Sequence, residues 1–281
     1  VALAMSAARL AMKKVLLHDM KCIETLARVD VLCVDKTGTI TENAMKVQGV
    51  KETAEYDPAS MPPLEVLIGD FATAMNSDNA TMAAVKEEFT RTSGRRAVSV
   101  TGFSSVTKYS SVTFGDGAYV MGAPEFVLLE KFDSYAAQIS DYASTGARVL
   151  AFGTYDGVVD GKPLAHGIRP LGFLLLANPI RKTAPETFAY FAKQGVEVKV
   201  ISGDNPVTVS NVAREAGIDH AEAYVDASQL RSDEELREAV LHNTVFGRVT
   251  PDQKRKFVQA LKEAGHTVAM TGDGVNDVLA R

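Results

Sequence analysis

Hydrophobic and polar positions along the chain follow two periodicities. Short apolar runs rich in β-branched side chains predict strands at 31–34, 148–155, 171–176, 197–201 and 267–270. Apolar residues at helical spacing predict helices at 6–26, 64–75, 80–89, 124–129, 135–144, 184–194, 207–216 and 252–263. From residue 171 onward the strands alternate with helices, which is typical of right-handed βαβ units and a parallel sheet.

The middle of the chain has a different texture. Between residues 96 and 120, Gly102, Gly115 and Gly117 separate short segments, a pattern that predicts antiparallel strands and hairpins. The strand at 31–34 finds no alternating partner until residue 171. We therefore expect an α/β fold with a parallel sheet built from residues 1–47 and 171–281, and an inserted α+β domain with an antiparallel sheet over residues 48–170.

Composition narrows the class of protein. With 281 residues, 46% of them hydrophobic, the chain can form one large or two ordinary domains. A net charge of -5 argues against nucleic acid as a partner, and no run approaches the roughly 18 apolar residues that span a bilayer. Cys22 and Cys33 have no metal-binding spacing, and we expect both to be reduced. Because the sequence starts at Val1 without Met and stops abruptly at Arg281, we expect a piece of a longer polypeptide.

The segment around Asp35 carries the most distinctive chemistry. Asp35 directly follows an apolar strand, so its carboxylate is expected at the carboxyl end, the edge where open α/β sheets bind ligands. Lys36 and the amides around Gly38 can gather an anion beside it. A carboxylate facing a phosphoryl group is the chemistry of an aspartyl-phosphate nucleophile. An isolated strand-end Asp more often caps a turn, and this alternative stays open on the residues alone.

Two later segments carry further candidates. Thr250 and Pro251 begin a predicted helix, which places Lys254 in its first or second turn, where the helix N-terminus and a cation together favour an anion. An ordinary surface lysine is the alternative. Asp273 and Asp277 lie with Asn276 on a glycine-bracketed loop, and their oxygens are of the type that Mg²⁺ prefers. A metal-free turn is the alternative there.

Seven consecutive residues, Asp-Lys-Thr-Gly-Thr-Ile-Thr at 35–41, resemble the phosphorylation motif of the P-type ATPases, ion and lipid pumps whose catalytic domain belongs to the haloacid dehalogenase superfamily. Thr-Gly-Asp-Gly-Val-Asn-Asp at 271–277 resembles their hinge motif without a gap. The resemblance implies a Rossmann-like phosphorylation domain, an inserted nucleotide-binding domain, and ATP and Mg²⁺ as cofactors. It also implies the cytoplasmic loop of a membrane pump whose transmembrane and actuator domains lie outside this sequence.

The resemblance also implies roles for individual residues. Catalytic roles fall on Asp35, Lys36, Thr37, Ser202, Gly203, Lys254, Asn276 and Asp277. Mg²⁺ ligands would be Asp35, the Thr37 carbonyl and Asp273. Nucleotide contacts fall on Phe103, Lys108, Gly122, Arg148, Asp204, Arg181 and Arg248. On the residues alone, Ser202 could equally cap the following helix, and Phe103 could be a plain core residue.

Departures from the family pattern shape the remaining expectations. Met121 replaces a lysine and so removes a cation near the nucleotide, from which we expect a low or differently distributed affinity for ATP. Asn178 replaces an aspartate in the hinge between the domains, which weakens any ion pair there. Soluble phosphatases of the superfamily carry a second aspartate two residues after the nucleophile. Here that position is Thr37, so hydrolysis of an acyl-phosphate should be slow. A free-standing phosphatase and a nucleotide-binding regulatory module are the alternatives. Arg91, Arg95 and Arg96 are expected in a solvated loop.

Overall fold

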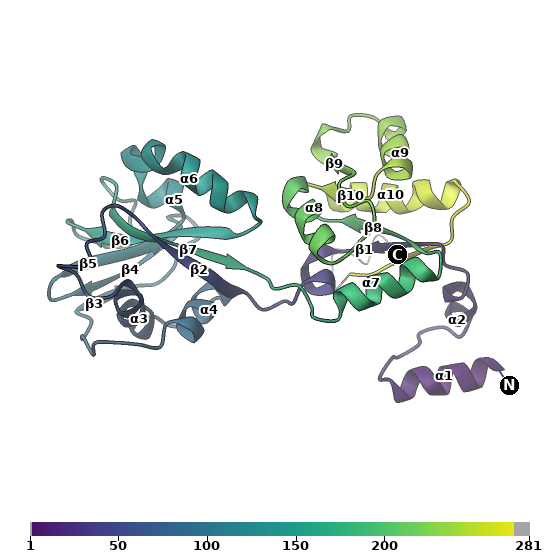
Figure 1. Ribbon diagram of the computed structural model, residues 1–281, viewed down its shortest axis with the longest axis horizontal. Coiled ribbons are helices and arrows are strands. Elements are labelled where there is room, and N and C mark those ends of the chain that lie inside the picture. The colour runs from purple at the N-terminus through teal and green to yellow at the C-terminus, as the bar shows by residue number, and fades with distance from the viewer. Residues whose placement is uncertain (1, 273–281) are drawn as a thin grey trace. The chain divides into compact units, whose positions relative to one another are not determined.

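The computed structural model describes residues 2–272, and the chain divides into two compact units. The parallel-sheet unit comprises Val1–Glu42 and Ile180–Arg281, and the antiparallel-sheet unit comprises Asn43–Pro179. Each unit has its own sheet and its own helices (Figure 1). The predicted α/β fold, with a parallel sheet and a separate antiparallel sheet, is confirmed. No helix within residues 2–272 combines the length and the apolar character needed to cross a membrane.

The sheet of the parallel-sheet unit has five described strands in the order β11–β1–β8–β10–β9, and every neighbouring pair is parallel. The strands are β1 (Val31–Val34), β8 (Glu197–Ile201), β9 (Tyr224–Asp226), β10 (Val245–Gly247) and β11 (Val268–Met270). The helices are α1 (Ala2–Met12), α2 (Lys21–Leu26), α7 (Ala184–Lys193), α8 (Pro206–Glu215), α9 (Asp233–His242) and α10 (Pro251–Glu263), with the short turns η1 (Lys36–Ile40) and η3 (Ala227–Gln229).

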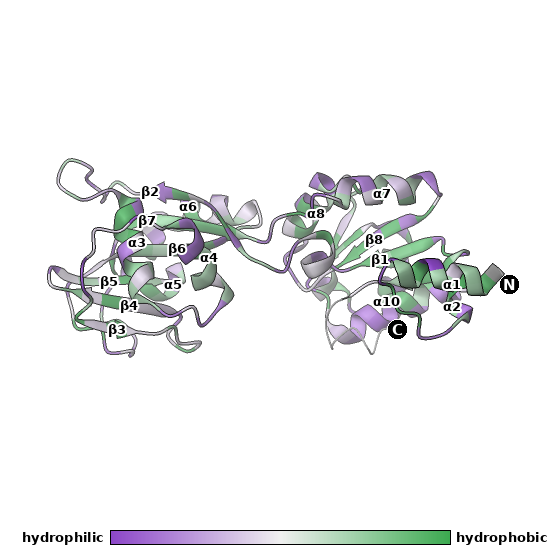
Figure 2. Cartoon of the chain, turned by 90° about the horizontal axis from the view of Figure 1, so that it is seen from below, coloured by the Kyte–Doolittle hydropathy of each residue, from purple (hydrophilic) through white to green (hydrophobic). Residues whose placement is uncertain are grey.

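Strand β1 is buried on both faces because helices cover both sides of its sheet. Successive side chains of a strand point to opposite faces. Leu32 and Val34 pack in a cluster with residues of α7 and α8, whereas Val31 and Cys33 pack with residues of α9 and α10. This two-sided burial requires an uninterrupted apolar run, and Figure 2 colours β1 as hydrophobic while α7 and α10 mix both kinds of residue. Burial raises the pKa of the Cys33 thiol to about 12, so this thiol is neutral and unreactive.

The antiparallel-sheet unit contains six described strands in the order β2–β7–β6–β5–β4–β3. The strands are β2 (Lys46–Glu52), β3 (Ser99–Thr101), β4 (Tyr109–Phe114), β5 (Gly117–Gly122), β6 (Arg148–Tyr155) and β7 (Arg169–Ala177). The helices are α3 (Leu64–Ala74), α4 (Ala80–Glu88), α5 (Pro124–Val127) and α6 (Phe132–Ser144), with the turn η2 (Leu129–Lys131). Residues of α3 and α4 pack on one face of the sheet and residues of α5 and α6 on the other.

Strand β7 does not belong to the sheet in which the sequence predicted it. A strand forms where residues 171–176 predicted it, but β7 pairs with β2 and β6 in the antiparallel sheet, so its assignment to the parallel sheet was wrong. The boundaries between the two units along the chain therefore fall at residues 42/43 and 179/180 rather than at 47/48 and 170/171. The reason is that β7 is an interior strand buried on both faces, and such burial produces the same continuous apolar run as a parallel strand.

The helix predicted at 6–26 is interrupted. The structure has α1 and α2 with residues 13–20 between them, and Lys14 adopts a left-handed φ of 62° that ends α1. Strands β2, β9 and β10 and helix α9 were not predicted. The three-residue strands β9 and β10 carry too few positions to show a periodicity.

Candidate active site

Asp35 lies at the carboxyl edge of the parallel sheet, directly after β1. Its backbone is still extended, and the chain then turns through Gly38, whose φ of 80° favours glycine. One carboxylate oxygen, Oδ1, accepts a hydrogen bond of 2.7 Å from the Lys36 amide. The other, Oδ2, lies 3.2 Å from Nζ of Lys254, which is 219 residues away in the sequence. The fold therefore brings a carboxylate and a cation together at a ligand-binding edge of the sheet.

Lys254 is held in this position by the start of α10. Thr250 and Gln253 form a capping box at the helix N-terminus, and Pro251 occupies the first turn. One turn further on, the Lys254 side chain is only 11% exposed. Phe257 on the same helix is fully buried against the sheet, so the helix cannot easily shift. The prediction that Lys254 lies in the first turns of a helix is confirmed, whereas its alternative as an ordinary surface lysine is not.

The loop after β8 contributes a buried hydroxyl and a second ion pair. Ser202 is 5% exposed, and its Oγ accepts a hydrogen bond from the Asp204 amide at 3.2 Å. The residue that caps α8 is Asn205, whose side chain accepts from the Val207 amide, so Ser202 is not the helix cap. Asp204 Oδ2 lies 2.5 Å from Nζ of Lys36. This ion pair joins the loop after β1 to the loop after β8.

Gly203 in this loop tolerates a side chain in terms of space. A Cβ built there would meet the Val249 carbonyl at 3.8 Å, an ordinary contact. The structure therefore gives no steric reason for glycine at position 203.

Two arginines predicted to contact nucleotide hold loops of the parallel-sheet unit. Arg181 donates from Nη2 to the Gly38 carbonyl at 2.7 Å, which ties it to the turn after Asp35. Arg248 has a left-handed φ of 51°, and its Nη1 lies 2.6 Å from Asp226 Oδ2. Its amide donates to the Asp204 carbonyl at 2.7 Å. Sequence reasoning missed Asp226, because nothing in its spacing relates it to Arg248.

Three predicted residues, Asp273, Asn276 and Asp277, lie outside the described residues. The end of β11 leads toward them, and the Thr271 amide donates to the Cys33 carbonyl at 2.9 Å. Oxygen atoms such as those of the Asp35 carboxylate and the Thr37 carbonyl are of the kind that a hard cation such as Mg²⁺ prefers. Within residues 2–272 no group of three or more His, Cys, Asp or Glu side chains could hold a metal. The predicted Mg²⁺ site therefore depends on Asp273 as well.

The antiparallel-sheet unit contains a cavity of about 500 Å³. Four residues predicted to contact nucleotide line it together: Phe103, Lys108, Gly122 and Arg148. The Phe103 side chain is 53% exposed, so it is not a plain core residue. Arg148 donates from Nη1 to Thr81 Oγ1 at 3.0 Å.

Position 122 has no room for any residue larger than glycine. A Cβ there would lie 2.6 Å from both the Lys108 carbonyl oxygen and Tyr109 Cβ, closer than real contacts allow. Met121, beside it, is 2% exposed and lines the cavity as well. The lining of this cavity thus includes an aromatic ring, two cations, the Glu125 carboxylate and an apolar thioether. The ring offers a stacking surface for a planar base, and the two cations can attract an anionic group.

Comparisons with known proteins identify the family of the chain. Residues 29–280 match the family model of haloacid dehalogenase-like hydrolases. The chain is 44% identical, over its whole length, to the calcium-transporting ATPase CtpE of Mycolicibacterium smegmatis, and 40% identical over 97% of its length to the probable cation-transporting ATPase exp7 of Streptococcus pneumoniae. It spans 34% of each of these relatives. The resemblance to cation-transporting ATPases noted in the sequence is thereby confirmed.

A solved structure shows the same fold. The chain matches a zinc-transporting PIB-type ATPase in the E2.Pi state with a TM-score of 0.65 and 20% sequence identity. The match covers 94% of this chain and 36% of the other.

Proposed function

The chain belongs to the haloacid dehalogenase-like hydrolase family, and within that family we propose that it is the ATP-binding and autophosphorylating part of a P-type cation-transporting ATPase. The observation that carries the proposal is the 3.2 Å contact between Asp35 and Lys254 at the carboxyl edge of the parallel sheet. The names of its relatives, both cation-transporting ATPases, support the same conclusion. In this proposal the antiparallel-sheet unit binds ATP and the parallel-sheet unit accepts the phosphoryl group.

The chemistry follows from the groups around Asp35. Enzymes accelerate phosphoryl transfer mainly by positioning the reactants and by neutralising charge on the transferring group. One oxygen of Asp35 attacks the γ-phosphorus of ATP, the bond from that phosphorus to the bridging oxygen breaks, and ADP leaves with the electron pair. The Lys36 amide orients the carboxylate through Oδ1, and the Lys254 ammonium lies where it can neutralise the phosphoryl oxygens. Mg²⁺, held by Asp35, the Thr37 carbonyl and Asp273, would supply further positive charge.

Two ion pairs hold the loops around Asp35 in place for this step. Lys36 and Asp204 link the loop after β1 to the loop after β8. Arg248 and Asp226 link the loop after β10 to the end of β9. The buried Ser202 hydroxyl lies in the same loop as Asp204, and we assign it to the phosphoryl oxygens. Loops fixed in this way reduce the reorganisation of polar groups that is needed when charge develops in the transition state.

Thr37 favours a pump over a phosphatase. A general base that activates water typically contributes about 10²–10⁴-fold to a hydrolytic step. Thr37 carries no ionisable group at the position where phosphatases of the superfamily carry their second aspartate. The acyl-phosphate should therefore persist long enough for a conformational change. Because the chain spans about a third of its curated relatives, we assign the transmembrane and actuator domains to the rest of a membrane pump, of which this chain would be the cytoplasmic loop.

The proposal is tested by labelling with γ-labelled ATP and Mg²⁺. Asp35→Asn should abolish label that is stable to acid and removed by hydroxylamine. Asp30→Asn is the matched control, because Asp30 precedes the same strand and binds His266 and the Thr267 amide at the opposite edge of the sheet. Undiminished labelling of Asp35→Asn would reject Asp35 as the nucleophile. Steady phosphate release without labelled protein would favour the phosphatase instead.

Nucleotide binding is tested separately. ATP without Mg²⁺ should shift NMR signals of residues around Phe103 and Arg148, which line the cavity. Unchanged signals there would move the nucleotide site elsewhere.

A further inference from the structure

Residues 89–98 connect α4 to β3 without helix or strand, and we call this segment the strap. The sequence predicted that its arginines are solvated, which is wrong for Arg95. The Arg95 side chain is 23% exposed. Its guanidinium carbon lies 4.3 Å from the centroid of the Phe114 ring and 5.0 Å from that of Tyr119, so it covers one end of the core.

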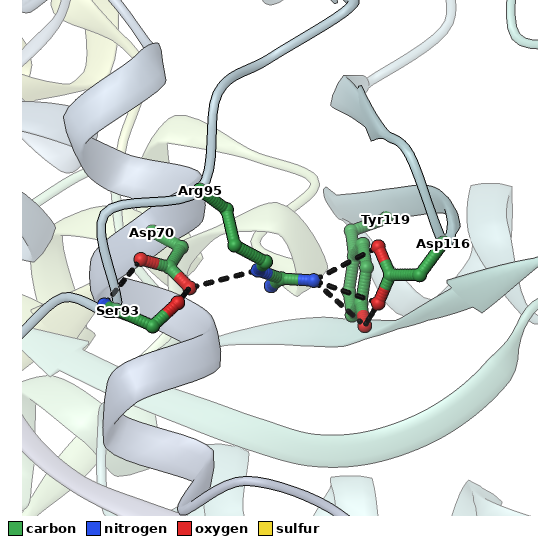
Figure 3. A network of polar contacts seen from close by, with 5 residues as sticks. All are labelled: Asp70, Ser93, Arg95, Asp116 and Tyr119. Carbon is green, nitrogen blue, oxygen red and sulfur yellow. Dashed lines mark hydrogen bonds and ion pairs between the residues drawn. The ribbon is translucent and has the colours of Figure 1, made fainter.

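Arg95 connects three parts of the antiparallel-sheet unit (Figure 3). Its Nε donates to Asp70 Oδ2 on α3 at 2.9 Å. Its Nη1 reaches both oxygens of Asp116, in the turn between β4 and β5, at 2.9 and 2.8 Å. Asp70 also accepts from the amide and the hydroxyl of Ser93 in the strap, at 2.8 and 2.6 Å. The strap is therefore joined through side chains to a helix on one side and to a hairpin turn on the other.

A buried carboxylate, that of Asp70, accepts hydrogen bonds from both Ser93 and Arg95 in this network. Asp70 is 3% exposed. Burial by itself would raise the pKa of Asp70, but the hydrogen bonds from Ser93 and Arg95 outweigh burial, and the pKa is lowered. Loss of Arg95 would leave an ionised carboxylate with fewer partners in a buried place, which favours opening of the strap. Backbone packing adds a second constraint, since a Cβ at Gly69 would lie 1.9 Å from the Arg91 carbonyl oxygen.

The strap continues directly into β3 and the loop that bears Phe103. Strand β3 has three residues and lies at the edge of the sheet, so β4 is its one described neighbour. The Val98 amide donates to the Thr113 carbonyl at 2.7 Å just before it. So short an edge strand is weakly held by its own ladder. Asp116 lies in the hairpin turn that follows β4, so the Arg95–Asp116 contact adds an anchor between the strap and the strand with which β3 pairs.

Part of the cavity lining, including Met82 and Met121, belongs to the face of the sheet that carries the network, and Ile139 and Val149 belong to the other face. Tyr119 and Met121 are two residues apart on β5 and belong to the same core cluster. Tyr119 lies under Arg95, while Met121 lines the cavity. On β4, Phe114 lies under Arg95 and Ser110 lines the cavity. A shift of the strap would therefore reach the cavity through β4 and β5 as well as through β3.

We propose that Arg95 is a positioning residue for the nucleotide cavity, which it serves by clamping the strap to α3 and to the β4–β5 turn and thereby holding Phe103 at the cavity. The inference rests on the proposed function of this cavity. Arg95 does not contact the nucleotide. It restricts the loop that carries the aromatic ring, so that binding ATP requires less ordering of that loop.

A unique fluorophore reports on this position. The chain has no tryptophan, so Phe103→Trp provides a single tryptophan at the cavity, whose emission is separated from that of the tyrosines by selective excitation of the indole. In that background Arg95→Gln should shift the emission to longer wavelength and increase its quenching by acrylamide at temperatures where the protein is folded. A global loss of stability alone would leave the emission of the folded state unchanged.

Affinity gives the second readout. With Phe103 restored, Arg95→Gln should raise the Kd for Mg²⁺-free ATP by about fivefold, a partial loss of the ~1–3 kcal/mol that stacking on an aromatic ring contributes. The matched control is Arg91→Gln, because Arg91 pairs with Glu65 through side chains that are 68% and 50% exposed. This control should change neither the emission nor the Kd.

The outcomes separate the inference from the function on which it rests. Phe103→Ala should raise the Kd by about tenfold, and an unchanged Kd there overturns both the nucleotide cavity and the role of Arg95. If Phe103→Ala weakens binding while Arg95→Gln changes neither readout, the role of Arg95 is overturned and the cavity stands. If Arg95→Gln does not fold, Asp116→Ala decides, because it removes both oxygens that accept from Arg95 in the turn and leaves the Arg95–Asp70 pair intact. It should give smaller changes in the same direction, and no change overturns the inference.

Discussion

Replacing Lys254 by Met removes the cation beside Asp35 with little change of side-chain length. The two charges lie 3.2 Å apart. At an effective dielectric constant of about 20, Coulomb's law gives about 5 kcal/mol for such a pair before the cost of desolvating the ammonium. The Lys254 and Asp35 side chains are only 11% and 23% exposed, so solvent screens the pair less than it screens a surface pair.

The effect on catalysis depends on how much of this attraction persists when charge moves to the phosphoryl group. Removing one preorganised group that stabilises a transition state typically costs about 10²–10³-fold in rate. We therefore expect Lys254→Met to slow formation of the acyl-phosphate by about 10²–10³-fold. The affinity for ATP should change little, since the cavity that we assign to the nucleotide is lined by residues of the antiparallel-sheet unit.

Rapid-quench labelling with γ-labelled ATP measures this rate. Lys256→Met on the same helix is the matched control, because that side chain is 42% exposed and pairs with Asp233 and Asp252 at the surface. The control should label at the normal rate. A labelling rate for Lys254→Met within about threefold of that of the unmodified chain, in protein shown to be folded by its urea transition, would refute the role of this contact.

Three further predictions follow from single positions. Thr37→Asp should accelerate loss of phosphate from the labelled protein by about 10²–10⁴-fold, measured by chasing with unlabelled ATP; an unaltered decay would contradict the role of Thr37. Met121→Lys places a third cation at the cavity and should lower the Kd for ATP by about threefold to tenfold in calorimetry, whereas an equal or higher Kd would count against it. Since the pKa of Asp70 is lowered from 3.8, its contribution to stability is present above pH 4 or so and is lost as pH falls through the folded-state pKa. Asp70→Asn should therefore flatten the acid limb of urea midpoints, and an identical limb would contradict this.

Much of the architecture could be predicted from the pattern of the chain. The apolar run at 31–34, rich in β-branched residues, predicted a buried strand, and the structure places β1 there with all four residues buried. Helices α7 and α8, which flank β8 in the sequence, were predicted from apolar residues at helical spacing, and these residues form the face that each helix buries. Four of the seven residues predicted to contact nucleotide line one cavity although they range from position 103 to 148, whereas Arg181, Asp204 and Arg248 belong to the parallel-sheet unit. That prediction came from the family resemblance rather than from any spacing.

Other features depend on contacts between distant segments and could not be predicted. The pattern of β7 shows that it is buried on both faces, but not which sheet buries it, and the pairing with β2 settles the matter. The ion pairs of Lys36 with Asp204 and of Arg248 with Asp226 join loops whose order in space depends on the strand order. Arg95, in a stretch rich in charge and turn residues, resembles a solvated arginine until Phe114 and Tyr119 are placed beneath it.

Local periodicity and a short run of consecutive residues were thus enough to identify the strand, the nucleophile candidate and the class of fold, because each depends on interactions within a few residues of the chain. Only the tertiary structure shows the contact between Asp35 and Lys254, the sheet to which β7 belongs, and the contacts of Arg95 with α3 and the β4–β5 turn. Each of these needs two surfaces distant in sequence to be brought within a few ångströms, and that distance is a property of the packed sheet and its helices, not of any segment alone.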